Sequence, residues 1–599
     1  MPFGAELLTR GGVRFRLWAP DMAAPKLRLG AGGEALLLPL EAMRAGWFEL
    51  WTERAGAGTP YAFVLDDGEI VPDPASRAQE GDVTGASLVV DPGSYRWRET
   101  VWAGRPWHEA TIMEVHVGSF TAEGTFRALA ERLPHLAGLG ITAIQLMPVQ
   151  AFGGRRNWGY DAVLWFCPAP VYGTPDELKA LIDAAHELGI MVFLDVVYTH
   201  FGPAGNALPL YASGFLRDDV PTPWGPAVDY RQRPVRDFVI HNALFWLEEY
   251  RVDGLRLNDV QQVVDEETPD VIDELAAAVV ERFGAERHVH LILENQERDL
   301  TRLDGAFRAQ WNDDLHHALH AALTGERRGR YAPFAADPIE ALGRTLAQGI
   351  VVEHAAALEA EPDEDAPPPE TPAPTASLPP TRFVAYLENH DRAGNRPDGA
   401  RLASLVLPHV RRAGQAIVAL SPQIPMLFMG EEWGTTTPFY FFNDFEGTIA
   451  QSVRLGRSRQ LEPFDAGEAP PDPGAVETFE ATRLNWDEAT SSSGLAEQAF
   501  VRTLLEVRNR EIVPLLDAAP AKAGRWERIG AYGLVVRWTL GRGRTLCVVA
   551  QLGDAPGQGF VHPTGTLIWA SGPEVDVQLA AGRMPPWSVA AFLGTEEGG

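Results

Sequence analysis

The sequence predicts an α/β fold, a (β/α)8 barrel preceded by an immunoglobulin-like β-sandwich and followed by a small all-β domain. Three observations support this prediction. Strand-like and helix-like segments alternate from Thr111 onward, four apolar runs end in polar side chains, and short alternating strands occupy both ends of the chain. Repeated strand-helix units form parallel sheets, and this many units close a barrel. We place the three domains at 1–100, 101–515 and 516–599.

The first hundred residues contain short strands separated by turn sequences. Residues 13–18 (VRFRLW) alternate between apolar and polar side chains, as a half-buried strand does. Further strands are expected at 46–51 and 61–65, and the Asp-Asp-Gly sequence at 66–68 supplies a turn. This spacing is typical of a β-sandwich.

The middle of the chain has the rhythm of a barrel. Strands are expected at 111–117, 141–147 and 190–197, and helices at 125–139, 174–188 and 235–250. Thr174 is a candidate N-cap for the second helix. The acidic, proline-rich stretch 361–380 cannot bury much apolar surface, so we expect a solvated insertion in the barrel without regular structure. After 515 the helical pattern fades, and strands are expected at 533–539 and 546–550.

Bulk properties exclude several classes of function. The chain has 599 residues and a formal net charge of −30, which argues against nucleic acid and anionic membranes as partners and is compatible with a neutral ligand such as a sugar. Its two cysteines, Cys167 and Cys547, cannot form a disulfide framework or a metal cluster. We expect a cytoplasmic protein, because we find neither a signal-peptide pattern nor a long apolar span. We expect a monomer or a homodimer.

The organising stretch is 251–259, with the sequence RVDGLRLND. Similar stretches, each with a carboxylate or histidine at or near the end of an apolar run, occur at 193–200, 291–295 and 388–391. In a (β/α)8 barrel the carboxyl ends of the strands face the active site, so these polar side chains are expected to meet. Each of these residues, taken alone, could have a purely structural role. A glutamate at a strand end is usually a surface or salt-bridge residue. His390-Asp391 could cap a helix, and Arg256 could form a structural ion pair. The ordered set favours one site.

The residue types fit the cleavage of a glycosidic bond, which needs a proton donor and a nucleophile or base. Glu294 follows an apolar strand, so partial burial could keep its carboxyl protonated near neutral pH. Asp391 could bind sugar hydroxyls and stabilise positive charge at the reacting carbon. His200 and His390 could donate hydrogen bonds to the sugar, and Arg256 would orient the carboxylates.

Several stretches together resemble the maltooligosyltrehalose trehalohydrolases, glycoside hydrolases of the α-amylase superfamily. They lie at 114–118 (EVHVG), 157–161 (NWGYD), 195–203, 241–249, 310–317 (QWNDDLHH), 389–396 and 421–433. The resemblance covers nearly the whole chain. It implies hydrolysis of the α-1,4 bond next to the terminal α,α-trehalose of a maltooligosyltrehalose, without a metal or other cofactor.

The resemblance also assigns roles to residues. It implies that Glu294 is the acid/base and Asp391 the transition-state stabiliser, and that Tyr160 stacks under the sugar at the cleavage point, since aromatic faces suit pyranose rings. It implies substrate binding by Asp313 in the Trp-Asn-Asp-Asp stretch. Trp158 could bind substrate or only pack.

The sequence departs from the family at the nucleophile, where the resemblance expects Asp and this chain has Asn258. An amide is neutral and cannot readily form a glycosyl-enzyme. Members usually also have Asn, Glu and His where this chain has Thr199, Gln145 and Gln261. Asp259 is adjacent, but alternation along a strand is expected to turn its side chain to the opposite face, so that it could substitute only through a bulge or a slip.

Several explanations stay open. Asn258 could be a substitution made to trap substrate, the chain could be a natural α-glucan-binding homologue without catalysis, or Glu294 could act as base on an inverting path. The several changes around one site favour the second somewhat. A branching or debranching relative fits the general motifs but not the stretches above. We expect a retaining, trehalose-releasing hydrolase that Asn258 impairs.

Overall fold

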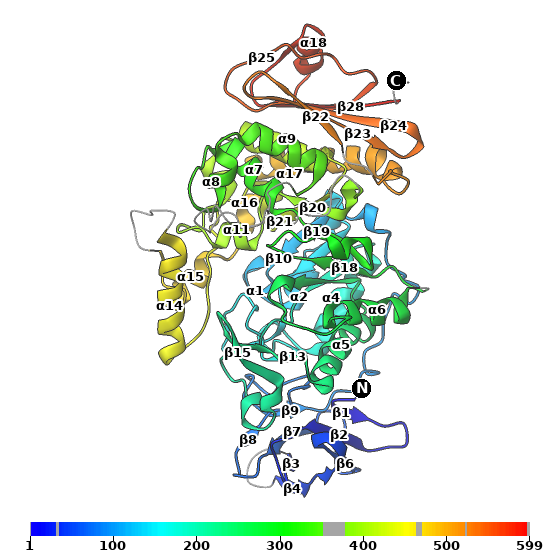
Figure 1. The fold of residues 1–599 in the computed structure, drawn as a ribbon, viewed down its shortest axis with the longest axis vertical. Helices are drawn as coiled ribbons and strands as arrows, with labels where there is room; N and C mark the ends of the chain where they lie inside the picture. The colour runs from blue at the N-terminus through cyan, green and yellow to red at the C-terminus, as the bar shows by residue number, and fades with distance from the viewer. Residues whose placement is uncertain are drawn as a thin grey trace, which may run out of the picture.

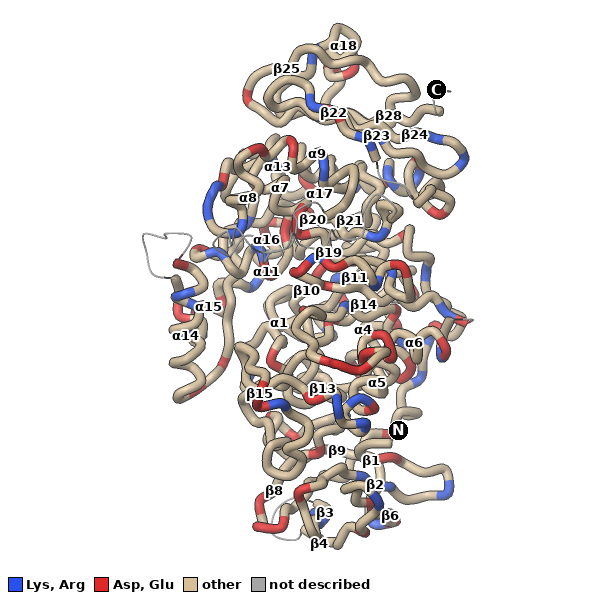
Figure 2. Tube along the Cα trace, viewed as in Figure 1, with Lys and Arg blue, Asp and Glu red and all other residues tan. Residues whose placement is uncertain are grey.

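A computed structural model describes residues 2–30, 35–284, 286–350, 378–462, 470–521 and 524–595. The molecule is elongated, with the N-terminal sheets at one end, a barrel in the middle and the C-terminal sheet at the other end (Figure 1). Acidic residues occur in all three regions, so the net charge of −30 is not confined to one of them (Figure 2). The predicted fold class is confirmed, whereas the exact domain limits stay predictions.

The barrel closes through eight parallel strands. Neighbouring strands pair in chain order, and β10 closes the barrel by pairing with β21. The eight are β10 (Ile112–Val115), β11 (Ala143–Leu146), β14 (Met191–Val197), β17 (Gly254–Asn258), β18 (His290–Leu293), β19 (Phe307–Trp311), β20 (Phe383–Tyr386) and β21 (Ile424–Phe428).

Helices cover the outside of the barrel. The main ones are α4 (Pro175–Glu187), α5 (Arg233–Glu248), α6 (Val271–Phe283), α7 (Asp313–Thr324), α9 (Pro338–Gln348), α13 (Pro408–Leu420) and α17 (Ser492–Val507). Thr174 caps α4 in a capping box with Glu177, as a helix start at this position requires.

The helix predicted over 125–139 is two helices, α2 (Phe126–Ala130) and α3 (Leu133–Leu139), so that prediction was wrong. Pro134 is the cause, because proline has no N–H and its ring clashes with the carbonyl four residues earlier, which belongs to Ala130.

Two antiparallel sheets form the N-terminal region. One has the order β1 (Gly4–Leu7), β2 (Val13–Trp18), β6 (Trp47–Thr52), β5 (Glu41–Ala42), and the other has β4 (Leu36–Pro39), β3 (Lys26–Leu29), β7 (Pro60–Val64), β8 (Ile70–Val71), with β9 (Ser87–Leu88) also on β7. Phe15 of the first sheet meets Tyr61 of the second at 4.9 Å between ring centroids. The sheets therefore pack face to face around an apolar core.

The C-terminal region is a five-stranded antiparallel sheet. Its order is β22 (Arg525–Ile529), β23 (Gly533–Leu540), β24 (Arg544–Gln551), β28 (Ser588–Thr595), β26 (Thr566–Ala570). The indole of Trp538 donates a hydrogen bond of 3.1 Å to the carbonyl of Leu346, so this sheet is anchored on α9.

Most of the acidic, proline-rich stretch lies outside the described residues. Of 361–380, only 378–380 are described, and Pro380 starts the short 3-10 helix η10 (Pro380–Arg382), against the expectation of no regular structure. Among the helices that the structure describes, none is long and apolar enough to cross a membrane.

Two excursions from the barrel matter for the site. The hairpin β15 (Leu216–Thr222) and β16 (Gly225–Val228) follows β14, and α14 (Gly447–Leu461) follows β21. In Figure 1 α14 extends beside the barrel at the left edge of the molecule.

Candidate active site

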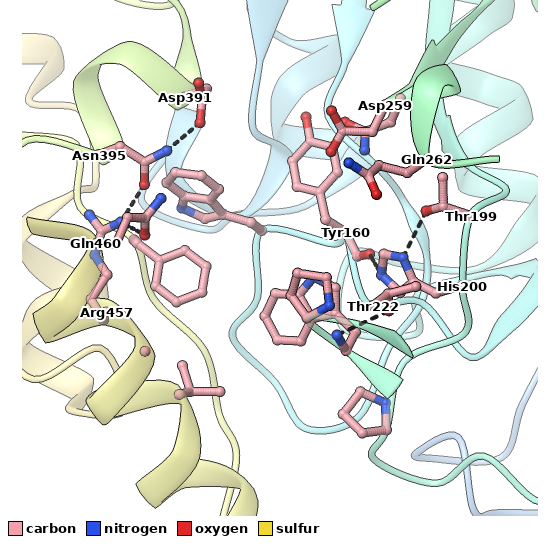
Figure 3. A pocket seen from close by; sticks show the side chains of 18 of the residues that line it. Tyr160, Thr199, His200, Thr222, Asp259, Gln262, Asp391, Asn395, Arg457 and Gln460 are labelled. Atoms are coloured by element: carbon pink, nitrogen blue, oxygen red, sulfur yellow. Dashed lines mark hydrogen bonds between the residues drawn. The ribbon is translucent and has the colours of Figure 1, made fainter. Parts of the chain in front are cut away.

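A cavity of about 810 Å³ opens at the carboxyl ends of the barrel strands. Its wall combines the strand ends with the turn of the β15–β16 hairpin and one face of α14. The residues that line it include Trp158, Tyr160, Thr199, His200, Trp224, Asn258, Asp259, Gln261, Glu294, Gln296, His390, Asp391, Asn395, Arg457 and Gln460. Figure 3 shows Asp391, Asn395, Arg457 and Gln460 on one side and Tyr160, Thr199, His200 and Asp259 on the other.

Arg256 lies fully buried beneath the cavity and connects the polar groups at the strand ends. One guanidinium nitrogen donates to both Asp195 oxygens at 2.9 and 2.7 Å and to the Asn258 side-chain oxygen at 2.7 Å. The other lies 2.5 Å from a Glu294 oxygen in an ion pair. Arg256 therefore has the orienting position that the sequence predicted, but it does not itself line the cavity.

Glu294 immediately follows β18 and is 5% exposed. Burial raises the pKa of its carboxyl well above the ordinary value; the Arg256 charge opposes this, and Asp259, Asp313 and Asp391 add to it. A carboxyl whose pKa is raised keeps its proton to higher pH than a free glutamic acid does, and at the wall of a cavity it can donate that proton to a bound substrate. The geometry supports the proton-donor role that we predicted.

Asp259 is where the structure corrects the sequence argument. Strand β17 ends at Asn258, and Asp259 takes up a left-handed backbone conformation with φ 46° and ψ 49°. Alternation therefore stops before Asp259, and its side chain joins the cavity wall beside Asn258 instead of turning away. Burial raises the pKa of the Asp259 carboxyl, as it raises the pKa of Glu294.

Asp391 lies in the first turn of α11 (His390–Gly394), which Asn389 caps by accepting from the Arg392 amide at 2.7 Å. Arg330 and Arg392 approach the Asp391 carboxylate at 3.2 and 2.9 Å. Asn395 donates to it, and Arg457 of α14 donates to Asn395 in turn (Figure 3). His390 and Asp391 thus do form the start of a helix, and the same helix directs Asp391 into the cavity.

Tyr160 and His390 form a stacked pair, with ring centroids 5.0 Å apart and an interplanar angle of 23°. The Tyr160 hydroxyl donates to Asp195 at 2.7 Å, and His390 is held by Glu114 through its ring at 2.7 Å and its backbone amide at 2.8 Å. The Tyr160 ring is therefore fixed in orientation before any ligand binds.

The other predicted binding residues differ in how they meet the cavity. Trp158 lines it and also packs, because its indole donates to the Tyr440 carbonyl at 3.0 Å and its ring stacks on Phe439. His200 lines it too, but its ring nitrogens contact the Thr199 hydroxyl at 2.8 Å and the Tyr160 carbonyl at 3.1 Å. Burial lowers the pKa of His200 to about 4, so the ring is neutral at pH 7.

Asp313, the first residue of α7, lies outside the cavity lining. It pairs with Arg392 at 2.7 Å and accepts from the Tyr386 hydroxyl. Because Arg392 also contacts Asp391, Asp313 touches the site through a neighbour, and the geometry gives no support to the direct substrate contact that we predicted.

The three other departures from the family have different surroundings. Thr199 contacts His200, and Gln261 donates to Asp259 at 3.1 Å. Gln145 is fully buried in the barrel, and within the described residues neither its amide nitrogen nor its oxygen has a hydrogen-bond partner. Nothing in the structure explains the amide at that position.

Sequence reasoning missed the wall formed by α14 and by Trp224. Arg457 and Gln460 belong to α14, and Trp224 belongs to the turn of the β15–β16 hairpin. Neither segment has the apolar run with a polar end that marks the barrel strands. Asp195 and Glu114 were inside quoted stretches, and the signal that could have found them is a buried carboxylate at a strand end facing an arginine or a histidine.

Comparisons with known proteins give the family of the chain. The family described as "Alpha amylase, catalytic domain" matches residues 78–207, and a "Domain of unknown function (DUF3459)" matches residues 521–591. A protein of Deinococcus radiodurans named malto-oligosyltrehalose trehalohydrolase is 38% identical over 97% of this chain and 95% of its own length.

Solved structures are similar over nearly the whole chain. A Salmonella typhimurium protein provisionally named an alpha amylase is 41% identical with a TM-score of 0.92, covering 99% of both chains. A pullulanase from Paenibacillus barengoltzii, 20% identical, superposes with a TM-score of 0.73 over 99% of this chain and 95% of that one. At that identity the second comparison shows a shared fold alone.

Proposed function

Because the chain belongs to the malto-oligosyltrehalose trehalohydrolase family, we propose that it hydrolyses the α-1,4-glucosidic bond next to the terminal α,α-trehalose of maltooligosyltrehaloses. The products are trehalose and a shorter maltooligosaccharide. One observation carries the proposal: the buried Glu294 carboxyl and the Asp391 carboxylate line one cavity with the fixed Tyr160 ring.

The chemistry follows from those positions. Glu294 gives its proton to the glycosidic oxygen, so that trehalose leaves as a neutral alcohol. The reacting carbon then gains positive charge, which an anion beside it must stabilise. Asp391, held by Arg330 and Arg392, binds the sugar hydroxyls and contributes negative charge.

Asn258 limits this reaction. Its oxygen accepts from Arg256, as a carboxylate there would, but the group has no charge to offer the reacting carbon. We therefore propose that cleavage is slower than it would be with Asp at this position.

The same amide favours a second candidate function, binding of α-glucans without cleavage. The two candidates bind the same ligands and differ in turnover, so only a product assay separates them.

The test is release of trehalose from maltotriosyltrehalose by the native protein beside Asn258→Asp. We expect release by both, with the variant faster by about 100-fold, the order of effect of removing a charge-stabilising group from a transition state. Maltopentaose, which has no trehalose end, is the control substrate. Peptide mass mapping of the native protein must exclude conversion of Asn258 to Asp. Binding without release by either protein would favour the second candidate.

A further inference from the structure

Asp259 is a carboxylate of the cavity wall and the chain neighbour of Asn258, whose side-chain amide carries no charge. It is the residue directly after β17, and it lines the same cavity as Asn258, Glu294 and Asp391. Its placement depends on a backbone conformation that non-glycine residues rarely adopt, with φ 46°. Such a conformation persists only where the surroundings hold it.

Three hydrogen bonds donated by backbone amides hold it. The Asp259 amide donates to the Glu294 carboxylate at 3.3 Å, and the Val260 amide donates to the Glu294 carbonyl at 3.1 Å. The Gln262 amide donates back to the Asp259 carbonyl at 2.8 Å. The turn that carries Asp259 is therefore fastened to the residue that we identify as the proton donor.

The side chain is held as well. Gln261 and Gln296 each donate from their side-chain amide to Oδ1 of Asp259, at 3.1 and 3.0 Å. The Gln261 side-chain oxygen accepts from the Gln296 backbone amide at 3.3 Å, which ties the two glutamines together. Neutral amides orient a carboxylate without cancelling its charge, and both bonds fall on the same oxygen.

Asn258 and Asp259 thus face different partners. The Asn258 oxygen is engaged by the buried Arg256, whereas Asp259 is oriented by two neutral donors at the wall. Arg256 and Asp391 act electrostatically on Asp259, which places this carboxylate inside the charge cluster of the site.

We infer that Asp259 is the nucleophile of this chain, acting through Oδ2. The inference rests on the proposed function. In the first step the Glu294 proton passes to the glycosidic oxygen, the bond from that oxygen to C1 breaks with its electron pair on trehalose, and Oδ2 forms an ester bond to C1.

In the second step a water molecule gives a proton to the Glu294 carboxylate, and its oxygen attacks C1. The ester C1–O bond breaks with its electrons returning to Asp259, and the maltooligosaccharide leaves. Both residues end in their starting protonation states.

The first experiment measures trehalose release from maltotriosyltrehalose by native protein, Asp259→Asn, Asn258→Asp and the double variant. We expect Asp259→Asn to lower the native rate by about 100-fold, and to lower the rate of Asn258→Asp by less than about threefold, because the carboxylate introduced at 258 then supplies the nucleophile. Asp299→Asn is the matched control, since Asp299 is exposed, lies outside the cavity lining and accepts a hydrogen bond from the Thr301 amide.

Folding must be separated from chemistry. Binding of maltotriosyltrehalose is measured by calorimetry, with Glu294→Gln as the uncleaving reference and Glu294→Gln/Asp259→Asn as the test. Dissociation constants within about threefold of each other are expected, because the substitution removes a charge and keeps the shape.

The second experiment traps the ester. α-Maltotriosyl fluoride needs no proton donor, so Glu294→Gln should form the glycosyl-enzyme and fail to hydrolyse it quickly. We expect one maltotriosyl adduct in the intact mass and fragmentation that assigns it to Asp259. Glu294→Gln/Asp259→Asn should give none.

Results other than these would overturn either the role of Asp259 alone or the proposed function as well. An adduct on another residue, or an unchanged native rate in Asp259→Asn, overturns the role of Asp259 and leaves the proposed function standing. Release by Asn258→Asp alone does the same. Release by no variant overturns the proposed function, and the inference with it.

Discussion

The backbone amide of Asp259 donates a hydrogen bond to the Glu294 carboxylate, with 3.3 Å between nitrogen and oxygen. This bond links the residues that follow two neighbouring barrel strands, β17 and β18, and it depends on the left-handed conformation at Asp259. The backbone at 259 and the position of the proton donor should therefore respond together to substitution.

Substitutions at 259 test how strongly the fold requires that backbone conformation. Asp259→Gly permits a left-handed backbone, whereas the β-branched side chain of Asp259→Val opposes it. We expect the valine variant to be less stable than the glycine variant by about 1–3 kcal/mol, the usual cost of a disfavoured conformation. Urea denaturation measures the difference, and equal stabilities would mean that the fold does not require the left-handed conformation at 259.

The positive charge of Arg256 compensates the buried carboxyl groups of Asp195 and Glu294. Asp195 and Glu294 both lie within ion-pair distance of it, and all three are at most 5% exposed. Replacing one partner of a buried pair leaves an uncompensated charge, so Arg256→Met should cost about 3–5 kcal/mol of folding stability.

The matched control is Arg127→Met, which removes an arginine 80% exposed and 3.7 Å from Glu131. An exposed pair of this kind contributes about 1 kcal/mol or less. A loss at Arg256 no larger than the loss at Arg127 would contradict our description of the cluster.

The pH dependence of turnover follows from Glu294. Burial raises its pKa well above the ordinary value, and the acid function requires the protonated form. Activity should therefore persist to higher pH than an ordinary glutamic acid would allow, and it should fall as pH rises through the Glu294 pKa. A profile of kcat against pH measures this alkaline limb, with α-maltotriosyl fluoride as the comparison because its first step needs no acid. An identical alkaline limb for both substrates would count against Glu294 as donor.

Tyr160 should contribute to binding mainly through its ring. The ring is fixed by His390 and its hydroxyl by Asp195, at 2.7 Å. Tyr160→Ala should weaken binding of maltotriosyltrehalose by about tenfold, the usual worth of an aromatic contact, whereas Tyr160→Phe should change it by less than about threefold. Calorimetry in the Glu294→Gln background measures both, and equal losses would place the contribution in the hydroxyl.

The barrel and the position of Glu294 could be predicted from sequence because apolar runs with polar ends describe the strands directly. The position of Asp259 could not be predicted, because alternation holds only within a strand and β17 ends one residue earlier. The left-handed conformation of Asp259 has no signal in the local sequence. Arg457 was missed for another reason, because α14 reaches the cavity from beyond the last barrel strand. Pro134 is a sequence signal for the break between α2 and α3, and the prediction of one helix did not take it into account.

The anomeric form of the first product tests the double displacement most directly. Cleavage places the new anomeric centre on maltotriose, because trehalose has no reducing end. Proton NMR during the first minutes of maltotriosyltrehalose hydrolysis by the native protein should show α-maltotriose, which later equilibrates with the β form. Initial β-maltotriose would mean inversion by water, with no ester on Asp259, and would contradict the account.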